Sequence, residues 1–297
     1  MGSNCTGNLY TGPVRQPISQ PTTLIDALGG MFPDSSRTTL RKMMQSGRVL
    51  VNTEMEKDAR RELRRGDMVE VGPKASLLQL PLGLAMLHED AEVIVVVKSN
   101  GLLTVATERE TSETAQAYLN AYLREKGEER IHVVHRLDRE SSGVLVFAKS
   151  LEAREALKEQ FAEHTTERVY VAIIEGAIEP PKGTIRSYLA EDRSLKMGSV
   201  QNDKDAKFAV THYTTLETGS RYSMLRVTLE TGRKNQIRAH LSEKGHPIVG
   251  DQLYGSTSNP IGRLGLHARL LGFRHPRTGE KMTFTAEIPK VFRELKL

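Results

Sequence analysis

Apolar residues occur along most of this chain in short runs with the spacing of strands, and only a few stretches repeat with helical spacing. The longest purely aliphatic run, Val93–Val97, is much too short to span a bilayer, so the pattern predicts a soluble protein. Strand-like runs occupy residues 93–97, 131–134, 143–147, 169–174 and 224–229. Helical composition is found at 113–125 and after the capping Ser150, up to about Ala162. Because strands and helices do not alternate regularly, the pattern predicts an α+β fold with a largely antiparallel mixed sheet.

An earlier segment, residues 22–72, has the pattern of a small independent α/β unit. Leu24 to Leu28 predicts a short helix that ends at Gly29-Gly30. Ser35-Ser36 can cap a second helix, and short strands follow at 49–52 and 68–71. Within the second helix, Arg37 and Arg41 lie one turn apart, and Arg48 follows at the next turn. These arginines are either an RNA-binding surface or, as most charge runs are, a solvated helix face.

Composition suggests four segments. Residues 1–21 are rich in Gly, Ser, Thr, Pro and Gln and predict a flexible tail. After the unit at 22–72, the Pro- and Gly-containing stretch 73–88 predicts a linker. Residues 89–297 then form one large domain.

Overall composition excludes several classes of protein. The 297 residues are 38% hydrophobic and 27% charged, as in ordinary globular proteins. A single cysteine, Cys5, excludes an intrachain disulfide and a cysteine-based zinc site. With no Trp, 7 Phe and 8 Tyr, a broad aromatic stacking platform is excluded. The net charge of +5 suits a polyanionic partner but equally suits a metabolic enzyme.

The first candidate for chemistry is the segment His135–Gly143, which lies between two predicted strands. Asp138 is flanked by Arg136 and Arg139, and a Ser-Ser-Gly turn follows. Neighbouring guanidinium groups should lower the pKa of Asp138 and keep it ionised. A permanently ionised carboxylate serves as a nucleophile or a base. The alternative is a turn carboxylate in a surface ion pair.

A second candidate is the basic segment Gly232–His240. Thr231-Gly232 can end a strand and begin a helix whose positive end faces an anion. Arg233, Lys234 and Gln236 are then expected to contact RNA phosphate or a base edge. The alternative is a basic helix on the surface. Four histidines lie in or near these two segments: His135, His240, His246 and His267. None has metal-ligand spacing with another, so we expect them to form hydrogen bonds.

Together these segments resemble the RluA-like family of RNA pseudouridine synthases. The resemblance rests on motifs that occur in order over residues 89–293: His135–Lys149, Arg168-Val169-Tyr170, Gly232–His240, Gly245–Asp251, Leu266-His267-Ala268 and His275-Pro276. The departures are Ser141 for the usual Thr, Arg168 for Lys, Lys234-Asn235 for Thr-His, and Ser99 for the Pro that usually follows Lys98. Residues 22–72 resemble the small RNA-binding domain of ribosomal small-subunit protein four, on the residues from Ser36-Arg37 to Val69.

The resemblance implies a base-flipping isomerisation of uridine. Asp138 is expected to be the catalytic carboxylate, either attacking the anomeric carbon or removing a sugar proton. Arg238 would pair with Asp138, and Tyr170 would stack on the base and take part in proton transfer. Arg136 would fill the gap left by the flipped uridine, and Leu266 would line the base pocket. No cofactor or metal is implied.

Other functions remain open at this point. The chain could be a catalytically silent RNA-binding or ribosome-assembly factor with the same fold, or a synthase directed at transfer RNA rather than ribosomal RNA. A glycosidase or nucleosidase needs a second carboxylate paired with Asp138, and we expect no such pair. We expect a cytoplasmic monomer with RNA as its partner and no association with membranes.

Overall fold

The structure is a computed structural model that describes residues 14–45, 49–52, 54–71, 80, 83–108, 110–192, 196–201 and 204–297. The chain divides into two compact units, Met1–Gln79 and Leu80–Leu297. Each unit is described below by itself.

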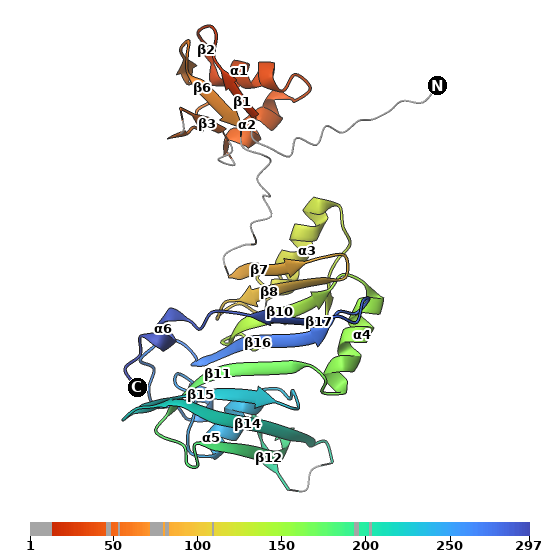
Figure 1. Ribbon diagram of the computed structural model, residues 1–297, viewed down its shortest axis with the longest axis vertical. Coiled ribbons are helices and arrows are strands. Elements are labelled where there is room, and N and C mark those ends of the chain that lie inside the picture. The colour runs from red at the N-terminus through yellow and green to blue at the C-terminus, as the bar shows by residue number, and fades with distance from the viewer. Residues whose placement is uncertain are drawn as a thin grey trace. The chain divides into compact units, whose positions relative to one another are not determined.

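The N-terminal unit packs two helices against small antiparallel sheets (Figure 1). Its four-stranded sheet has the order β1-β6-β3-β4, and β2 pairs with β5. Leucine, valine and methionine side chains from both helices and the strands form one core cluster. The elements are β1 (Val14–Pro17), β2 (Thr22–Thr23), α1 (Leu24–Met31), α2 (Arg37–Gln45), β3 (Val49–Val51), β4 (Glu54–Met55), β5 (Glu62–Leu63) and β6 (Met68–Val71).

The sequence pattern located most of this unit correctly. The Ser36 hydroxyl accepts a hydrogen bond from the backbone N–H of Thr39 at 3.2 Å, so Ser36 caps α2 as predicted. Helix α1 continues through Gly29 and Gly30 rather than ending there, because Leu24 and Leu28 anchor it in the core. The prediction of a flexible tail is wrong for residues 14–17, which form β1 and pair with β6.

The C-terminal unit is built on one long mixed sheet whose strands follow one another across the unit (Figure 1). The order is β13-β12-β14-β15-β11-β16-β10-β8-β7, with β17 beside β16 and β9 beside β10. Its strands are β7 (Leu84–Glu89), β8 (Val93–Lys98), β9 (His132–Val133), β10 (Ser142–Ala148), β11 (Glu167–Glu175), β12 (Lys182–Glu191), β13 (Met197–Val200), β14 (Lys207–Thr218), β15 (Tyr222–Leu229), β16 (Leu266–Arg274) and β17 (Lys281–Thr285).

All strand pairs of this sheet are antiparallel among the described residues except β10 with β16, which run parallel. The α+β class with a largely antiparallel sheet is therefore confirmed. Strand β7 begins at Leu84, so the predicted linker 73–88 is wrong for residues 84–88. Because β7 pairs with β8 along its length, these residues belong to the sheet.

Helices cover both faces of the sheet and divide its core into clusters. The remaining elements are α3 (Ala115–Lys126), α4 (Leu151–Ala162), α5 (Gln236–Glu243), the 3-10 helix η1 (Gln252–Tyr254) and α6 (Lys290–Arg293). One face carries a cluster with side chains of α3 and a second cluster with side chains of α5. Tyr170 of β11 packs against both clusters. Helix α4, capped by Ser150, packs on the opposite face with Val144 and Val146 of β10.

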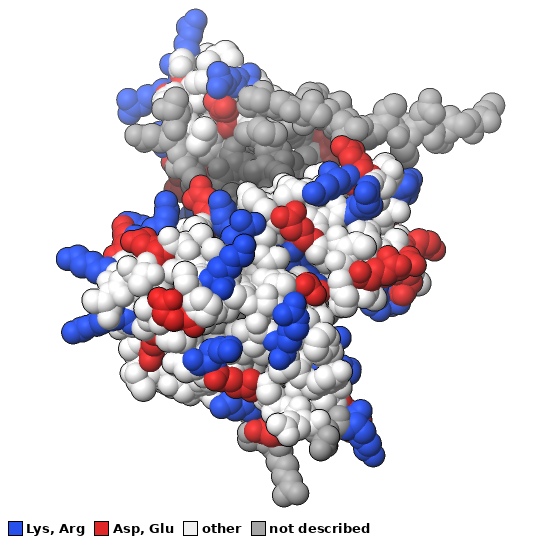
Figure 2. Space-filling view, turned by 60° about the horizontal axis from the view of Figure 1, so that its bottom comes forward, with Lys and Arg blue, Asp and Glu red and all other residues white. Residues whose placement is uncertain are grey.

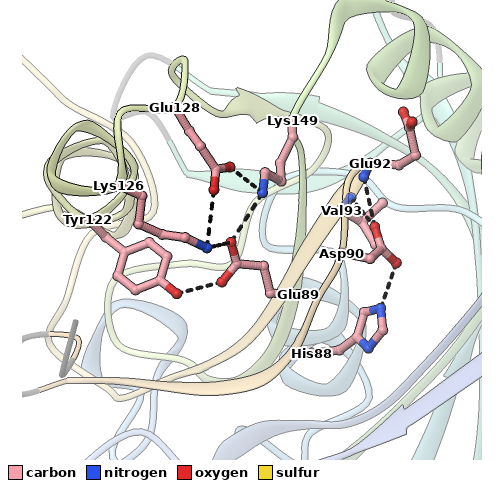
Figure 3. A network of polar contacts seen from close by, with 9 residues as sticks. All are labelled: His88, Glu89, Asp90, Glu92, Val93, Tyr122, Lys126, Glu128 and Lys149. Carbon is pink, nitrogen blue, oxygen red and sulfur yellow. Dashed lines mark hydrogen bonds and ion pairs between the residues drawn. The ribbon is translucent and has the colours of Figure 1, made fainter. Parts of the chain in front are cut away.

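A network of polar and charged side chains joins β7 to α3 and to Lys149, which follows β10 (Figure 3). Glu89 of β7 accepts hydrogen bonds from Tyr122 and Lys126 of α3 at 2.5 Å each, and from Lys149 at 3.1 Å. Glu128 pairs with both lysines. Burial raises the pKa of Glu89, but the hydrogen bonds from its three donors outweigh burial and leave the pKa below its usual range.

No helix in the described part of the chain is long and apolar enough to cross a membrane.

Candidate active site

The segment that carries Asp138 connects β9 to β10, at the place where the sheet contains its one described parallel strand pair. Gly143 of β10 lies directly beside Ala268 of β16. A Cβ atom on Gly143 would lie 2.2 Å from the carbonyl oxygen of Ala268, and its φ of +124° disfavours any other residue. Glycine is therefore required for β16, which carries Leu266, to approach the segment of Asp138.

Buried hydrogen bonds fix the start of α5, on the other side of the site. The Gln236 amide accepts from the Thr231 hydroxyl and the Arg233 N–H, and donates to Val210 and Thr211. Asn235 precedes the helix in the left-handed region, with φ +49°. All the polar atoms of Gln236 are engaged within the protein. These bonds fix the side chain of Gln236 at the start of α5, and RNA binding by Gln236 stays a prediction.

These two segments face each other across a cavity of about 360 Å³. Its volume lies in the range of small-molecule sites, about 300–1,000 Å³. The cavity brings together eight residues that the sequence analysis singled out: Arg136, Asp138, Tyr170, Arg233, Lys234, Gln236, Arg238 and Leu266. These residues come from four separate parts of the chain, and the fold brings them to one cavity.

The closest cation to Asp138 is Arg238 on α5. Its Nη1 lies 3.5 Å from the Oδ2 of Asp138, whose side chain is 24% exposed. The same guanidinium donates from Nε and Nη2 to the two oxygens of Asp251, at 2.7 and 2.8 Å. In the sequence, Asp251 is only the last residue of the Gly245–Asp251 motif, and its place in the site was not predicted. Nothing local in the sequence indicates the pairing, because it depends on how the 245–251 segment folds back onto α5.

The predicted direction of the Asp138 pKa is wrong. Burial raises this pKa above its ordinary value, and the charge of Arg238 counteracts burial only in part. Arg136 contributes less than Arg238, and Arg139 turns away to donate to the carbonyl of Gly101. The neighbouring arginines are visible in the sequence, but the loss of water around the carboxylate arises only in the fold.

Tyr170 lies between the two core clusters on the same face as the cavity. Burial raises the pKa of its phenol to about 12. Its hydroxyl is therefore protonated at neutral pH and can donate a hydrogen bond. Leu266, which is 4% exposed, contributes an apolar wall.

Lys98, at the end of β8, is a second site residue without an assigned role in the sequence analysis. It is fully buried, and its Nζ donates to the carbonyls of Ser99, Leu102, Arg139 and Ser141 at 2.7 to 3.2 Å. Burial lowers its pKa to about 8, against the opposing effect of Asp138. Lys98 thus holds the Asp138 segment to the neighbouring loop through main-chain oxygens.

Histidines near the site form hydrogen bonds as predicted. His135 accepts from the Val146 N–H, and burial lowers its pKa to about 3, which keeps the ring neutral. His267 bonds to the Ser142 hydroxyl, which also accepts from Arg263. His240 bonds to Thr211 and Ser187, and His246 to the carbonyl of Glu175. Within the described residues no group of side chains could hold a metal ion.

The predicted RNA-binding residues fall in both units. On α2 of the N-terminal unit, Arg41 is exposed and Arg37 pairs with Asp26 at 3.0 Å, whereas Arg48 lies outside the described residues. At the cavity, Arg233 donates to the carbonyl of Phe208 and Lys234 pairs with Glu191. On the face of the C-terminal unit seen in Figure 2, basic and acidic side chains are interspersed. Binding of a polyanion there depends on local groups rather than on a broad positive field.

Comparison with known proteins identifies the family. A model of the RNA pseudouridylate synthase family matches residues 92–243, and a model of the S4 domain matches residues 31–69. The chain belongs to the RNA pseudouridylate synthase family. The protein is an RNA pseudouridine synthase, an isomerase, with an S4 domain in its N-terminal unit.

Several relatives support this identification. The synthase is 35% identical to an uncharacterized RNA pseudouridine synthase of Bacillus subtilis, YlyB, over 88% of this chain and 89% of the relative. It is also 35% identical to the ribosomal large subunit pseudouridine synthase D of Neisseria meningitidis, over 92% of this chain and 78% of the relative. Human RNA pseudouridylate synthase domain containing 4 has the same fold, with a TM-score of 0.60 and 24% identity over 70% of this chain and 90% of that chain.

Proposed function

We propose that the synthase isomerises uridines of ribosomal RNA and that Asp138 is its catalytic carboxylate. The observation that carries the catalytic assignment is the cavity in which Asp138, Tyr170, Leu266 and Arg238 meet. A cavity of this size suits one flipped nucleoside, with Tyr170 and Leu266 on the apolar side and Asp138 on the polar side.

In the proposed reaction, the bond from the anomeric carbon to N1 of uracil breaks and a bond from that carbon to C5 forms. Asp138 either attacks the anomeric carbon or removes a sugar proton at the neighbouring carbon. The proton at C5 leaves once the new bond has formed, and N1 ends protonated, so the reaction is an isomerisation. A carboxylate whose pKa is raised by burial is more basic when ionised than an exposed one, which favours either role. Tyr170 stacks on the base, and its protonated hydroxyl can relay a proton.

The remaining residues of the site are proposed to hold the RNA. Arg136 fills the gap left by the flipped uridine, and Arg233 and Lys234 contact the backbone next to the target. In the S4 domain, Arg37, Arg41 and Arg48 add contacts to structured RNA. Ribosomal RNA is the proposed substrate because relatives named ribosomal large subunit pseudouridine synthase D match most of this chain. We propose that the synthase works as a monomer and without a cofactor.

The test uses transcripts of large-subunit ribosomal RNA and of transfer RNA labelled with tritium at C5 of uridine. Wild-type synthase should release tritium from the ribosomal transcript, and a carbodiimide map should show pseudouridine at discrete positions. Asp138→Asn should release none above background, while its affinity for the RNA stays within about twofold because backbone contacts dominate affinity. Asp34→Asn, an exposed position in the N-terminal unit, is the matched control and should remain fully active.

Each part of the proposal fails on a different result. Turnover by Asp138→Asn would remove its catalytic role. Release from transfer RNA but not from ribosomal RNA would redirect the substrate assignment. Free uracil in place of pseudouridine would indicate a nucleosidase.

A further inference from the structure

Arg238 lies between two carboxylates that it contacts very differently. Asp251 accepts hydrogen bonds from Nε and Nη2 of Arg238 in a bidentate pair, at 2.7 and 2.8 Å. Nη1 of Arg238 donates to Oδ1 of Asn235 at 3.1 Å and lies 3.5 Å from Oδ2 of Asp138. The short, two-point contact is with Asp251, so Asp251 determines where the guanidinium lies.

Burial and backbone hydrogen bonds fix the position of Asp251. Its side chain is 1% exposed, and it does not line the cavity. Its carbonyl accepts from the backbone N–H groups of Tyr254 and Ser256, which turns the chain sharply after it. The ring of Tyr254 then lies 5.0 Å from the guanidinium of Arg238 and covers it. Because Asp251 is buried and does not line the cavity, we expect it to act on the reaction through Arg238 rather than by contact with the substrate.

The charges of Asp251 and Arg238 compensate each other. Burial lowers the pKa of Arg238, but the hydrogen bonds and charge of Asp251, together with the charges of Asp138 and Glu140, outweigh burial and raise it. Asp138 therefore faces a cation that is already paired, and the field that would favour its ionised form is weakened. Burial and the charge of Glu140 raise the pKa of Asp138, and the guanidinium 3.5 Å away offsets them only in part.

We propose that Asp251 is a positioning residue of the synthase: by holding Arg238 at two points and compensating its charge, it sets the place and the net charge of the group that faces Asp138. The proposal rests on the catalytic role proposed above for Asp138. This role gives a reason for the buried carboxylate of Asp251 beside Arg238, which already has Asp138 as a carboxylate partner. Without Asp251, the whole charge of Arg238 would act on Asp138, the nearest remaining carboxylate.

The experiment compares Asp251→Asn with wild type in single-turnover reactions on the tritiated ribosomal transcript, across a range of pH. The amide of Asn keeps an acceptor for Arg238 but removes the charge. The plateau rate should fall at least about tenfold, and the acid limb of the pH profile should move to lower pH. The half-saturating RNA concentration should stay within about twofold. The other charged or titratable groups that face Asp138 are Lys98, Arg136, Glu140 and Tyr170, and all are unchanged in this variant.

A second variant, Asp251→Glu, keeps the charge but displaces Arg238 by one methylene. Its plateau rate should fall while the acid limb stays in place. A merely structural role would lower the melting temperature and the active fraction of Asp251→Asn without moving the limb, and that result would overturn the proposal. If Asp251→Asn does not fold, a wild-type rate in Asp251→Glu would overturn it too.

Failure of this inference is distinguishable from failure of the proposed function. If Asp138→Asn is inactive but both Asp251 variants match wild type in rate and pH profile, the catalytic assignment stands and the role of Asp251 is wrong. If Asp138→Asn turns over, the proposed function itself fails.

Discussion

Gly143 allows the parallel strands β10 and β16 to approach, and we predict that Gly143→Ala opens this junction. A Cβ at this position would lie 2.2 Å from the carbonyl oxygen of Ala268 and 2.6 Å from its nitrogen. Both atoms are main chain, so no side chain can rotate away. Relief requires the strands to separate where Ser142 pairs with His267 and Gly143 with Ala268.

The size of the effect follows from two contributions. A backbone conformation rarely adopted by residues other than glycine costs about 1–3 kcal/mol. Weakening the pairing of β10 with β16 costs about 1 kcal/mol for each hydrogen bond lost. We therefore expect the free energy of unfolding to fall by about 3 kcal/mol or more. For a unit of this size that corresponds to a decrease of about 6–12 °C in melting temperature.

Calorimetry of the full-length protein measures the effect. Gly279→Ala is the matched control, because Gly279 also has a positive φ, of +72°, but no atom lies within 4 Å of the added Cβ. It should lose only about 1 kcal/mol, from backbone strain alone. If Gly143→Ala melts no earlier than Gly279→Ala, the close approach of the two strands does not constrain this position, and the reasoning is refuted.

Two further predictions follow from buried charged groups. Lys98→Met should lower the melting temperature and reduce the single-turnover rate at least about tenfold, with little change in RNA affinity. The reason is that four carbonyls around the Asp138 segment lose their hydrogen-bond donor. A wild-type rate would show that Lys98 does not hold the segment in place. The lowered pKa of Glu89 means that its contacts stabilise the fold fully above its unfolded pKa near 4.5 and are lost as the pH falls through the lower folded value. Glu89→Gln should therefore have a lower melting temperature than wild type at pH 7, and the difference in melting temperature should shrink below pH 4.5. Thermal unfolding monitored by circular dichroism measures both. A difference in melting temperature that stays constant with pH would contradict the linkage.

Much of this synthase could be predicted from local sequence signals. Strand alternation, capping residues such as Ser36 and Ser150, and the glycine turns placed most elements, because these signals act over a few neighbouring residues. The motifs also singled out Asp138, Tyr170, Arg238 and Leu266, which line one cavity in the fold, since each motif keeps its chemical residue types at short, fixed spacing. The resemblance supplied the expectation that these separate segments meet.

Contacts between distant segments were decided only by the tertiary structure. The pairing of β1 with β6 depends on a partner more than fifty residues away, so a polar N-terminal stretch gave no sign of it. Gln236 was expected to face RNA, but the fold surrounds its amide with four partners from β14 and the turn before α5. The pKa of Asp138 also depends on contacts between distant segments. Neighbouring arginines are visible in the sequence, whereas the exclusion of water and the pairing of Arg238 with Asp251 exist only once the chain has folded around them.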